Sequence, residues 1–253
     1  MKLSTTFTIT LFTSLSLFTS RAAQSKAQLF EGLGNHERTI TTNSAEAQEF
    51  FNQGLTWLYS FNHDEAIRSF TRAGELDKDC AMAWWGVSLA AGPQYNHPVM
   101  TEERSATAWS AMQNALARIE HTSPVERALI VALQLRNAKT EPSAEVRAIH
   151  NEAYAAALQK LWNEYPNDSD VGALYAEALM IRRPWKLYSV GERTPHEDTP
   201  RILATLERTL AVDPGHPGAL HLYIHAVEPS RTPERGLFAA NRLRNLVPGS
   251  GHM

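Results

Sequence analysis

Two proline-glycine pairs near the C-terminal end of the sequence are separated by the length of one helical hairpin. They are Pro214-Gly215 and Pro248-Gly249, and each follows a stretch in which apolar residues recur at helical spacing. Proline cannot continue a helix, so each pair predicts a helix end. The spacing of the pairs, about 34 residues, is a period long enough for two short helices and their turns. It predicts stacked helical hairpins that bury their cores against their neighbours.

Other helix ends fit the same period once two insertions are allowed. Pro166 also follows a helical pattern, and it precedes Pro214 by more than one period. We assign the surplus to residues 183–197, and part of a second surplus to residues 92–100. No segment shows sustained alternation of apolar and polar residues, so the predicted fold is all-α. We expect five helix–turn–helix repeats, two of them with long internal loops, starting near residues 47, 81, 121, 169 and 217.

Two helix starts carry capping residues. Ser123 precedes Pro124 and is followed by Glu126, which is the pattern of a capped first turn. Asn62 followed by Glu65 predicts the start of the second helix of the first repeat in the same way.

The first repeat carries small and aromatic residues at distinctive positions. Gly54, Ala66, Phe70 and Ala73 match positions 8, 20, 24 and 27 of the tetratricopeptide repeat, which this stretch resembles. The small residues let two helices approach closely, and Phe70 fills the gap to the neighbouring helix. Lys78 stands where that repeat usually has proline. The resemblance implies a right-handed α-solenoid with an extended concave face.

The N-terminal residues resemble a secretory signal peptide. Lys2 precedes an apolar run that is too short to span a bilayer, and Ser20 and Ala22 suit cleavage after Ala22. We therefore divide the chain into a signal peptide at residues 1–22, a lead-in segment at 23–46 and a repeat domain at 47–253. We expect the protein to be exported, periplasmic or secreted, with no stable membrane insertion.

Charge and cysteine content exclude some functions. The net charge is only −3, so no strong field favours nucleic acid. Cys80 is the single cysteine, so neither an intramolecular disulfide nor a cysteine-rich metal site is expected. The sequence contains no HExxH motif, phosphate loop or nucleophile motif, so no catalytic residue is predicted and enzyme activity is not indicated.

The octet HLYIHAVE, residues 221–228, places two imidazoles and a carboxylate on one face of an otherwise apolar helix. His221, His225 and Glu228 are spaced i, i+4 and i+7. This set is a workable half-site for Zn²⁺ or Cu²⁺. A hydrogen-bond network between groove and loop backbone explains the same stripe without a metal, and direct contact with an organic ligand is a third interpretation. In the register of the tetratricopeptide repeat, these residues occupy groove positions 5, 9 and 12.

Further polar and aromatic residues are predicted near the groove. Some lie in the connections within repeats and others at groove positions of the repeat register, and Glu177 is expected beside His225. His252 would be a groove residue of a sixth repeat, so we expect the sequence to be truncated. The candidate ligand-binding residues are His63, Trp85, Tyr95, Asn96, His97, Glu177, Trp185 and His252. The remaining histidines, His36, His121, His150, His196 and His216, are expected at the surface or in turns.

Several stretches together resemble a group of large exported bacterial tetratricopeptide proteins. They are FNHDEAIRSF, AMAWWG, GPQYN, RRPW, HLYIHAVE and VPGSGHM. This resemblance implies a fold and a localisation and supplies no activity. The favoured hypothesis is an exported scaffold that binds a peptide or protein partner in its concave groove. The alternative is a metal-binding protein or a metal-dependent enzyme, with Zn or Cu held around His221, His225 and Glu228.

Overall fold

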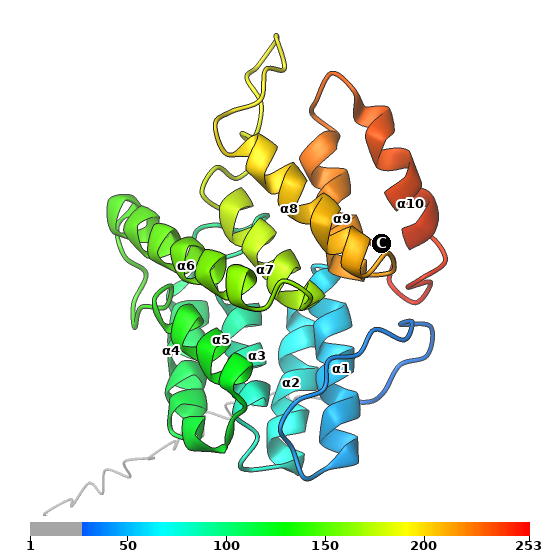
Figure 1. Cartoon of the computed structure of the whole chain (residues 1–253). Helices are drawn as coiled ribbons and strands as arrows, with labels where there is room; N and C mark the ends of the chain where they lie inside the picture. The colour runs from blue at the N-terminus through cyan, green and yellow to red at the C-terminus, as the bar shows by residue number, and fades with distance from the viewer. Residues whose placement is uncertain (1–26) are drawn as a thin grey trace, which may run out of the picture.

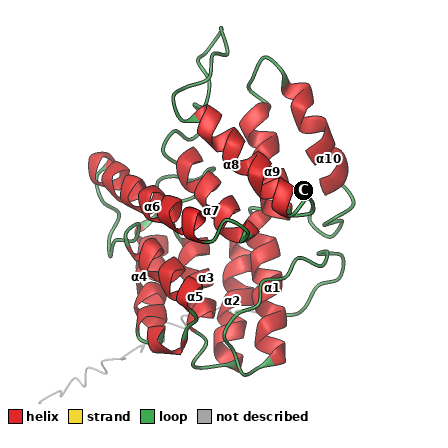
Figure 2. Cartoon of the chain, viewed as in Figure 1, coloured by secondary structure: helices red, strands yellow, loops and turns green. Residues whose placement is uncertain are grey.

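The computed structural model describes residues 27–253. The predicted signal peptide and its cleavage after Ala22 lie outside these residues. Within the described part, the regular structure consists of ten α-helices and two short 3₁₀ helices, with one isolated bridge between Tyr188 and Pro195 (Figure 2). The all-α prediction is confirmed.

We group the ten helices, in chain order, into five consecutive pairs (Figure 1). The first helices of the pairs are α1 (Ala45–Tyr59), α3 (Ala81–Ala91), α5 (Pro124–Gln134), α7 (Ser169–Met180) and α9 (Pro217–Val227). The second helices are α2 (His63–Leu76), α4 (Glu102–Leu116), α6 (Ala144–Glu164), α8 (Thr199–Val212) and α10 (Leu237–Leu243). The long connections predicted at residues 92–100 and 183–197 contain no helix. The first separates α3 from α4, and the second separates α7 from α8.

Each helix packs against the next in chain order, and the first helices also pack against one another. Contacts join α1 to α3, α3 to α5 and α7 to α9. In addition, α9 contacts α1, so the first helix of the fifth pair lies against the first helix of the first pair (Figure 1). This contact brings residues that are far apart in the sequence, such as Tyr59 and His221, into one core.

The close approach of α1 and α2 depends on small residues. Phe70 is fully buried, and a methyl group at Gly54 would lie 2.6 Å from its ring, while one at Gly86 would lie 2.5 Å away. Ala66 is also fully buried. Two helices can therefore pack around the Phe70 ring only because these positions lack larger side chains.

Both predicted caps are present. Asn62 accepts a hydrogen bond from the backbone N–H of Glu65, and Ser123 and Glu126 form a capping box at the start of α5. Cys80 is a buried free thiol that precedes α3. None of the helices in the described part of the chain is long and apolar enough to cross a membrane.

The lead-in segment lies against the helices. We call residues 27–42 the N-terminal strap. Its backbone donates hydrogen bonds to side chains of α1 and α5. The N–H of Phe30 bonds to Gln53, and the N–H of Thr41 bonds to Glu126. The strap also contacts the C-terminal segment, where the N–H of Gly249 donates to the carbonyl of Gly32 over 2.7 Å.

Candidate metal centre

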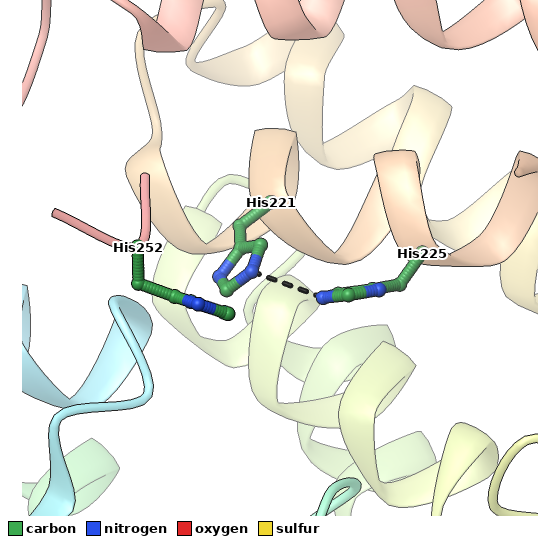
Figure 3. Close-up of side chains that lie close together, drawn as sticks. All are labelled: His221, His225 and His252. Atoms are coloured by element: carbon green, nitrogen blue, oxygen red, sulfur yellow. Dashed lines mark hydrogen bonds between the residues drawn. The ribbon is translucent and has the colours of Figure 1, made fainter.

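Three imidazoles meet beside the contact between α9 and α1 (Figure 3). His221 and His225 project from the same face of α9 because they are spaced by one helical turn. His252 comes from the turns that follow α10. One ring nitrogen of each lies within 4.8 Å of the others. His221 is buried, His225 is half-buried and His252 is exposed, so the cluster opens to solvent on one side.

The outer nitrogens of the first two rings are already committed. Nδ1 of His221 lies 2.6 Å from the main-chain oxygen of Tyr59, and Nδ1 of His225 lies 2.9 Å from Oε1 of Glu228. A carbonyl oxygen and a carboxylate can only accept, so both Nδ1 atoms carry the proton. In the neutral rings, both Nε2 atoms then carry lone pairs.

Those two lone pairs face each other, with the Nε2 atoms 3.1 Å apart (Figure 3). Two acceptors at this distance repel unless a cation lies between them. Two imidazoles on one tetrahedral Zn²⁺ hold their nitrogens about 3.3 Å apart, given Zn–N bonds of about 2.0–2.1 Å. A proton shared by the two Nε2 atoms, which would make one ring an imidazolium, is the metal-free alternative.

Burial makes His221 a poor proton acceptor. Desolvation lowers the pKa of His221 to about 3, against a smaller opposing effect of its hydrogen bond to Tyr59. The neighbouring imidazoles lower that pKa further. At neutral pH this ring is therefore neutral, which is the form that binds metal.

Phe61 forms an aromatic wall behind the cluster. Its ring centroid lies 4.3 Å from that of His221, 5.6 Å from that of His225 and 5.7 Å from that of His252. Phe61 joins α1 to α2 in the left-handed conformation, with a φ of 58°. This conformation is costly for a bulky side chain and persists only where the surroundings impose it, as happens at functional sites.

A second aromatic group covers His225. The Trp185 ring lies edge-on to His225 at 5.6 Å between centroids, and Tyr95 lies 5.0 Å from Trp185. Trp185 also has a left-handed φ, of 62°. Tyr95 is buried and Trp185 is exposed, so the two rings bury one side of the cluster and leave a tryptophan at its rim.

Glu228 lies outside the group of three ring nitrogens. Its carboxylate bonds to the outer nitrogen of His225 rather than joining the cluster, and His252 occupies the third position. The sequence predicted His252 as a ligand-binding residue but not as a metal ligand. It did not predict Tyr59 or Phe61 as residues of the site. The one available signal for them was their place just before the Asn62 cap, at the turn between two helices.

Other predicted residues lie behind the site or away from it. His63 is buried, and its Nδ1 lies 2.8 Å from the carbonyl of Phe61; desolvation lowers its pKa to about 4. Glu177 pairs with the buried Arg136 over 3.4 Å rather than with His225. Trp85 is 1% exposed, so it belongs to the core and offers no surface to a partner.

The loop residues Asn96 and His97 are not part of the cluster. Asn96 is half-buried and His97 is exposed. The backbone of His97 closes a turn with Gln94 through two hydrogen bonds, of 3.1 and 3.2 Å. Both residues therefore shape the connection that holds Tyr95.

A second cluster contains Asp170 and two histidines that were expected at the surface or in turns, His36 and His216. His216 does lie in a turn, but it is fully buried. Asp170 accepts hydrogen bonds from Nε2 of His36 and of His216, over 3.0 and 3.2 Å. It also accepts bonds from the Tyr59 hydroxyl over 2.5 Å and from Arg38 over 3.2 Å.

This second cluster is unsuited to a metal. Nδ1 of His216 accepts the backbone N–H of Ala219 over 3.1 Å, so the proton of this ring lies on Nε2, the atom that faces Asp170. Burial would raise the pKa of Asp170, but hydrogen bonds from His216 and His36 outweigh it and hold that pKa well below its usual value. We interpret Asp170 as a buried anchor whose acceptor sites are filled by protein donors.

A small cavity lies beside Phe61, the ring that packs against the three histidines. It has a volume of about 40 Å³, and its lining includes Phe61, His63, Arg136 and Glu177. Burial raises the pKa of Glu177. The cavity has room for a few water molecules and is too small for a peptide.

No protein-family model matches this chain, and no curated protein is significantly similar to it. The resemblance to tetratricopeptide proteins therefore stays a prediction.

Proposed function

We propose that this protein binds a divalent transition-metal ion, Zn²⁺ or Cu²⁺, through Nε2 of His221 and His225 and a ring nitrogen of His252. The observation that carries the proposal is the 3.1 Å approach of two Nε2 atoms whose rings are each bonded through Nδ1 to an acceptor. Neutral imidazole suits both ions. A bound ion would replace the repulsion between the facing lone pairs by two coordinate bonds.

The surroundings support a site that exchanges ligands. Three protein nitrogens leave a fourth position of a tetrahedral ion free, and three-histidine sets are typical of sites that take water or a small ligand there. Tyr59 and Glu228 serve as the outer partners that orient the rings. Because His252 is exposed, that position would face solvent. No catalytic residue is proposed.

We further propose that the five helix pairs are tetratricopeptide-like repeats wound into a right-handed solenoid, in an exported protein. The first helices begin at residues 45, 81, 124, 169 and 217, within a few residues of the starts that the sequence period predicts. Support for export comes from the sequence of residues 1–22. N-terminal sequencing of protein recovered from outside the cytoplasm should find Ala23 first, and a chain that retains Met1 there would contradict this.

A peptide or protein partner is the second candidate. The first helices α1 and α7 both pack against α9. The feature that favours a partner is an open hollow of about 920 Å³ over α2, α3 and α4, whose lining includes Arg68, Trp84 and Arg104. Trp84→Ala should weaken a partner that uses this surface and leave metal binding unchanged.

Metal content tests the main proposal. Protein incubated with Zn²⁺ or Cu²⁺ and then desalted should retain close to one ion per chain by elemental analysis. Replacing His225 or His252 by alanine should remove most of it, because two remaining ligands hold a divalent ion weakly. His97→Ala is the matched control, since this exposed histidine lies outside the cluster. A wild-type chain that retains neither ion would exclude the metal and leave the shared proton.

A further inference from the structure

The segment that carries His252 has little structure of its own. After α10 the chain forms single turns, closed by backbone bonds from Leu246 to Leu243 and from Ser250 to Val247. His252 itself is exposed. Short turns do not fix the direction of a side chain, so the position of this third imidazole depends on what the segment packs against.

The segment packs against the N-terminal strap. The N–H of Gly249 donates to the carbonyl of Gly32 over 2.7 Å. The two backbones touch so closely that a methyl group at Gly34 would lie 2.5 Å from the carbonyl oxygen of Leu246, and one at Gly249 would lie 2.8 Å from that of Glu31. Gly34 also has a φ of +75°, which L side chains rarely adopt.

The strap is in turn held by buried ion pairs. Arg38 donates two hydrogen bonds to Asp168, of 2.7 and 2.9 Å, and one to Asp170. His36 adds a bond to Asp170. The strap is therefore fixed to the start of α7, and it offers the C-terminal segment a rigid surface.

The same anchor reaches the buried side of the metal cluster. Asp170 accepts the hydroxyl proton of Tyr59, and the main-chain oxygen of Tyr59 accepts Nδ1–H of His221. One short segment thus supports both His221, through Asp170 and Tyr59, and His252, through Gly249.

We infer that the N-terminal strap is the positioning element of the metal site: it places His252 against His221 and His225, and so sets the affinity for the ion. This inference rests on the proposed metal binding. Gly34 and Gly249 are its positioning residues, since contact between the strap and the C-terminal segment requires that neither carries a side chain.

The test compares glycine-to-alanine variants by competition titration with Zn²⁺ and by the visible absorption of bound Co²⁺. Gly34→Ala and Gly249→Ala should each weaken Zn²⁺ binding at least about tenfold, the effect of misplacing a supporting group at a metal site. Their Co²⁺ spectra should match that of His252→Ala. Two glycines are matched controls, because a methyl group at either would meet nothing within 4 Å: Gly251 in the same segment, and Gly191, which also has a positive φ. Both control variants should bind like wild type.

A double variant tests whether Gly34→Ala weakens Zn²⁺ binding by misplacing His252 or by disturbing the rest of the site. Gly34→Ala combined with His252→Ala should bind Zn²⁺ no more weakly than His252→Ala alone, because the contact at Gly34 acts on the ion through that ligand. Wild-type affinity and an unchanged Co²⁺ spectrum in Gly34→Ala would overturn the inference. If the wild type binds neither ion, the proposed function itself fails, which is a different outcome.

Hydrogen exchange in the wild-type protein gives a second measurement that needs no variant. If the strap and the ion support each other, adding Zn²⁺ should slow exchange of the Gly249 amide, because coupling between two sites is reciprocal. The amide of Ala117, at the end of α4, is a control outside this region and should not change. Equal exchange of Gly249 with and without Zn²⁺ would contradict the inference.

Discussion

The main-chain oxygen of Tyr59 lies 2.6 Å from Nδ1 of His221, a residue 162 positions later in the chain. This bond determines which nitrogen of His221 carries its proton, and therefore which nitrogen faces His225. The contact between α1 and α9 thus sets the chemistry of the cluster as well as its place.

The carboxylate of Glu228 should strengthen metal binding without touching the ion. It accepts Nδ1–H of His225 and increases the basicity of the ring. Glu228→Ala should weaken Zn²⁺ binding by about 10–100-fold, the usual effect of losing such an outer partner, measured by competition titration. Glu234→Ala removes another exposed carboxylate and should change nothing. Complete loss of binding in Glu228→Ala would instead make Glu228 a direct ligand, as first predicted.

The free energy of unfolding of the metal-free protein should decrease as the pH is lowered below about 6.5. The pKa of His63 is lowered to about 4 and that of His221 to about 3, both chiefly by burial. Below 6.5 the unfolded chain binds protons at these positions and the folded chain does not, so protonation favours unfolding. The contribution is fully present above pH 6.5 and is lost progressively down to about pH 3. The pKa of His36 is raised, so its contribution to stability is fully present below pH 6.5 and is lost only as the pH rises above 6.5.

Urea unfolding between pH 4 and pH 6.5, in the presence of a chelator, measures this dependence. The wild-type midpoint should decrease steadily toward the lower pH. His63→Gln removes one of these groups, so its midpoint should depend less on pH in this window. Equal slopes for the two proteins would show that His63 is not a buried neutral imidazole.

The ion pairs of Arg38 should be worth far more than those at the surface. Arg38→Ala leaves the buried Asp170 without its cationic partner and should cost about 3–5 kcal/mol of unfolding free energy. Arg72→Ala is the control, since it removes two more exposed pairs and should cost at most about 1 kcal/mol. Chemical denaturation of both variants gives the comparison, and similar losses would mean that the strap is not held by this pair.

The packing of α1 against α2 should not tolerate a larger residue at position 66. Ala66 is fully buried in the helix that carries Phe70, and Ala66→Leu should cost about 1–3 kcal/mol through overpacking. Ala148→Leu, at an exposed position in α6, is the control and should be close to neutral. An unchanged thermal melt for Ala66→Leu would show that this position is less tightly packed than described.

Local patterns were sufficient for the secondary structure. The Asn62 cap and the Ser123–Glu126 capping box act within a single helical turn, and proline cannot continue a helix beyond its first turn, so helix starts and ends could be predicted without knowledge of the fold. The shared face of His221 and His225 was predictable for the same reason, since helical geometry alone sets it.

The rest of the site depended on tertiary contacts. Which nitrogen of His221 faces His225 depends on Tyr59, which lies on another helix. His252 reaches the cluster from the C-terminal turns, which bond to the strap between Gly249 and Gly32. Helical periodicity fixes the face from which a side chain projects. The partner that it meets is decided by packing between segments far apart in the sequence, and no local pattern encodes that.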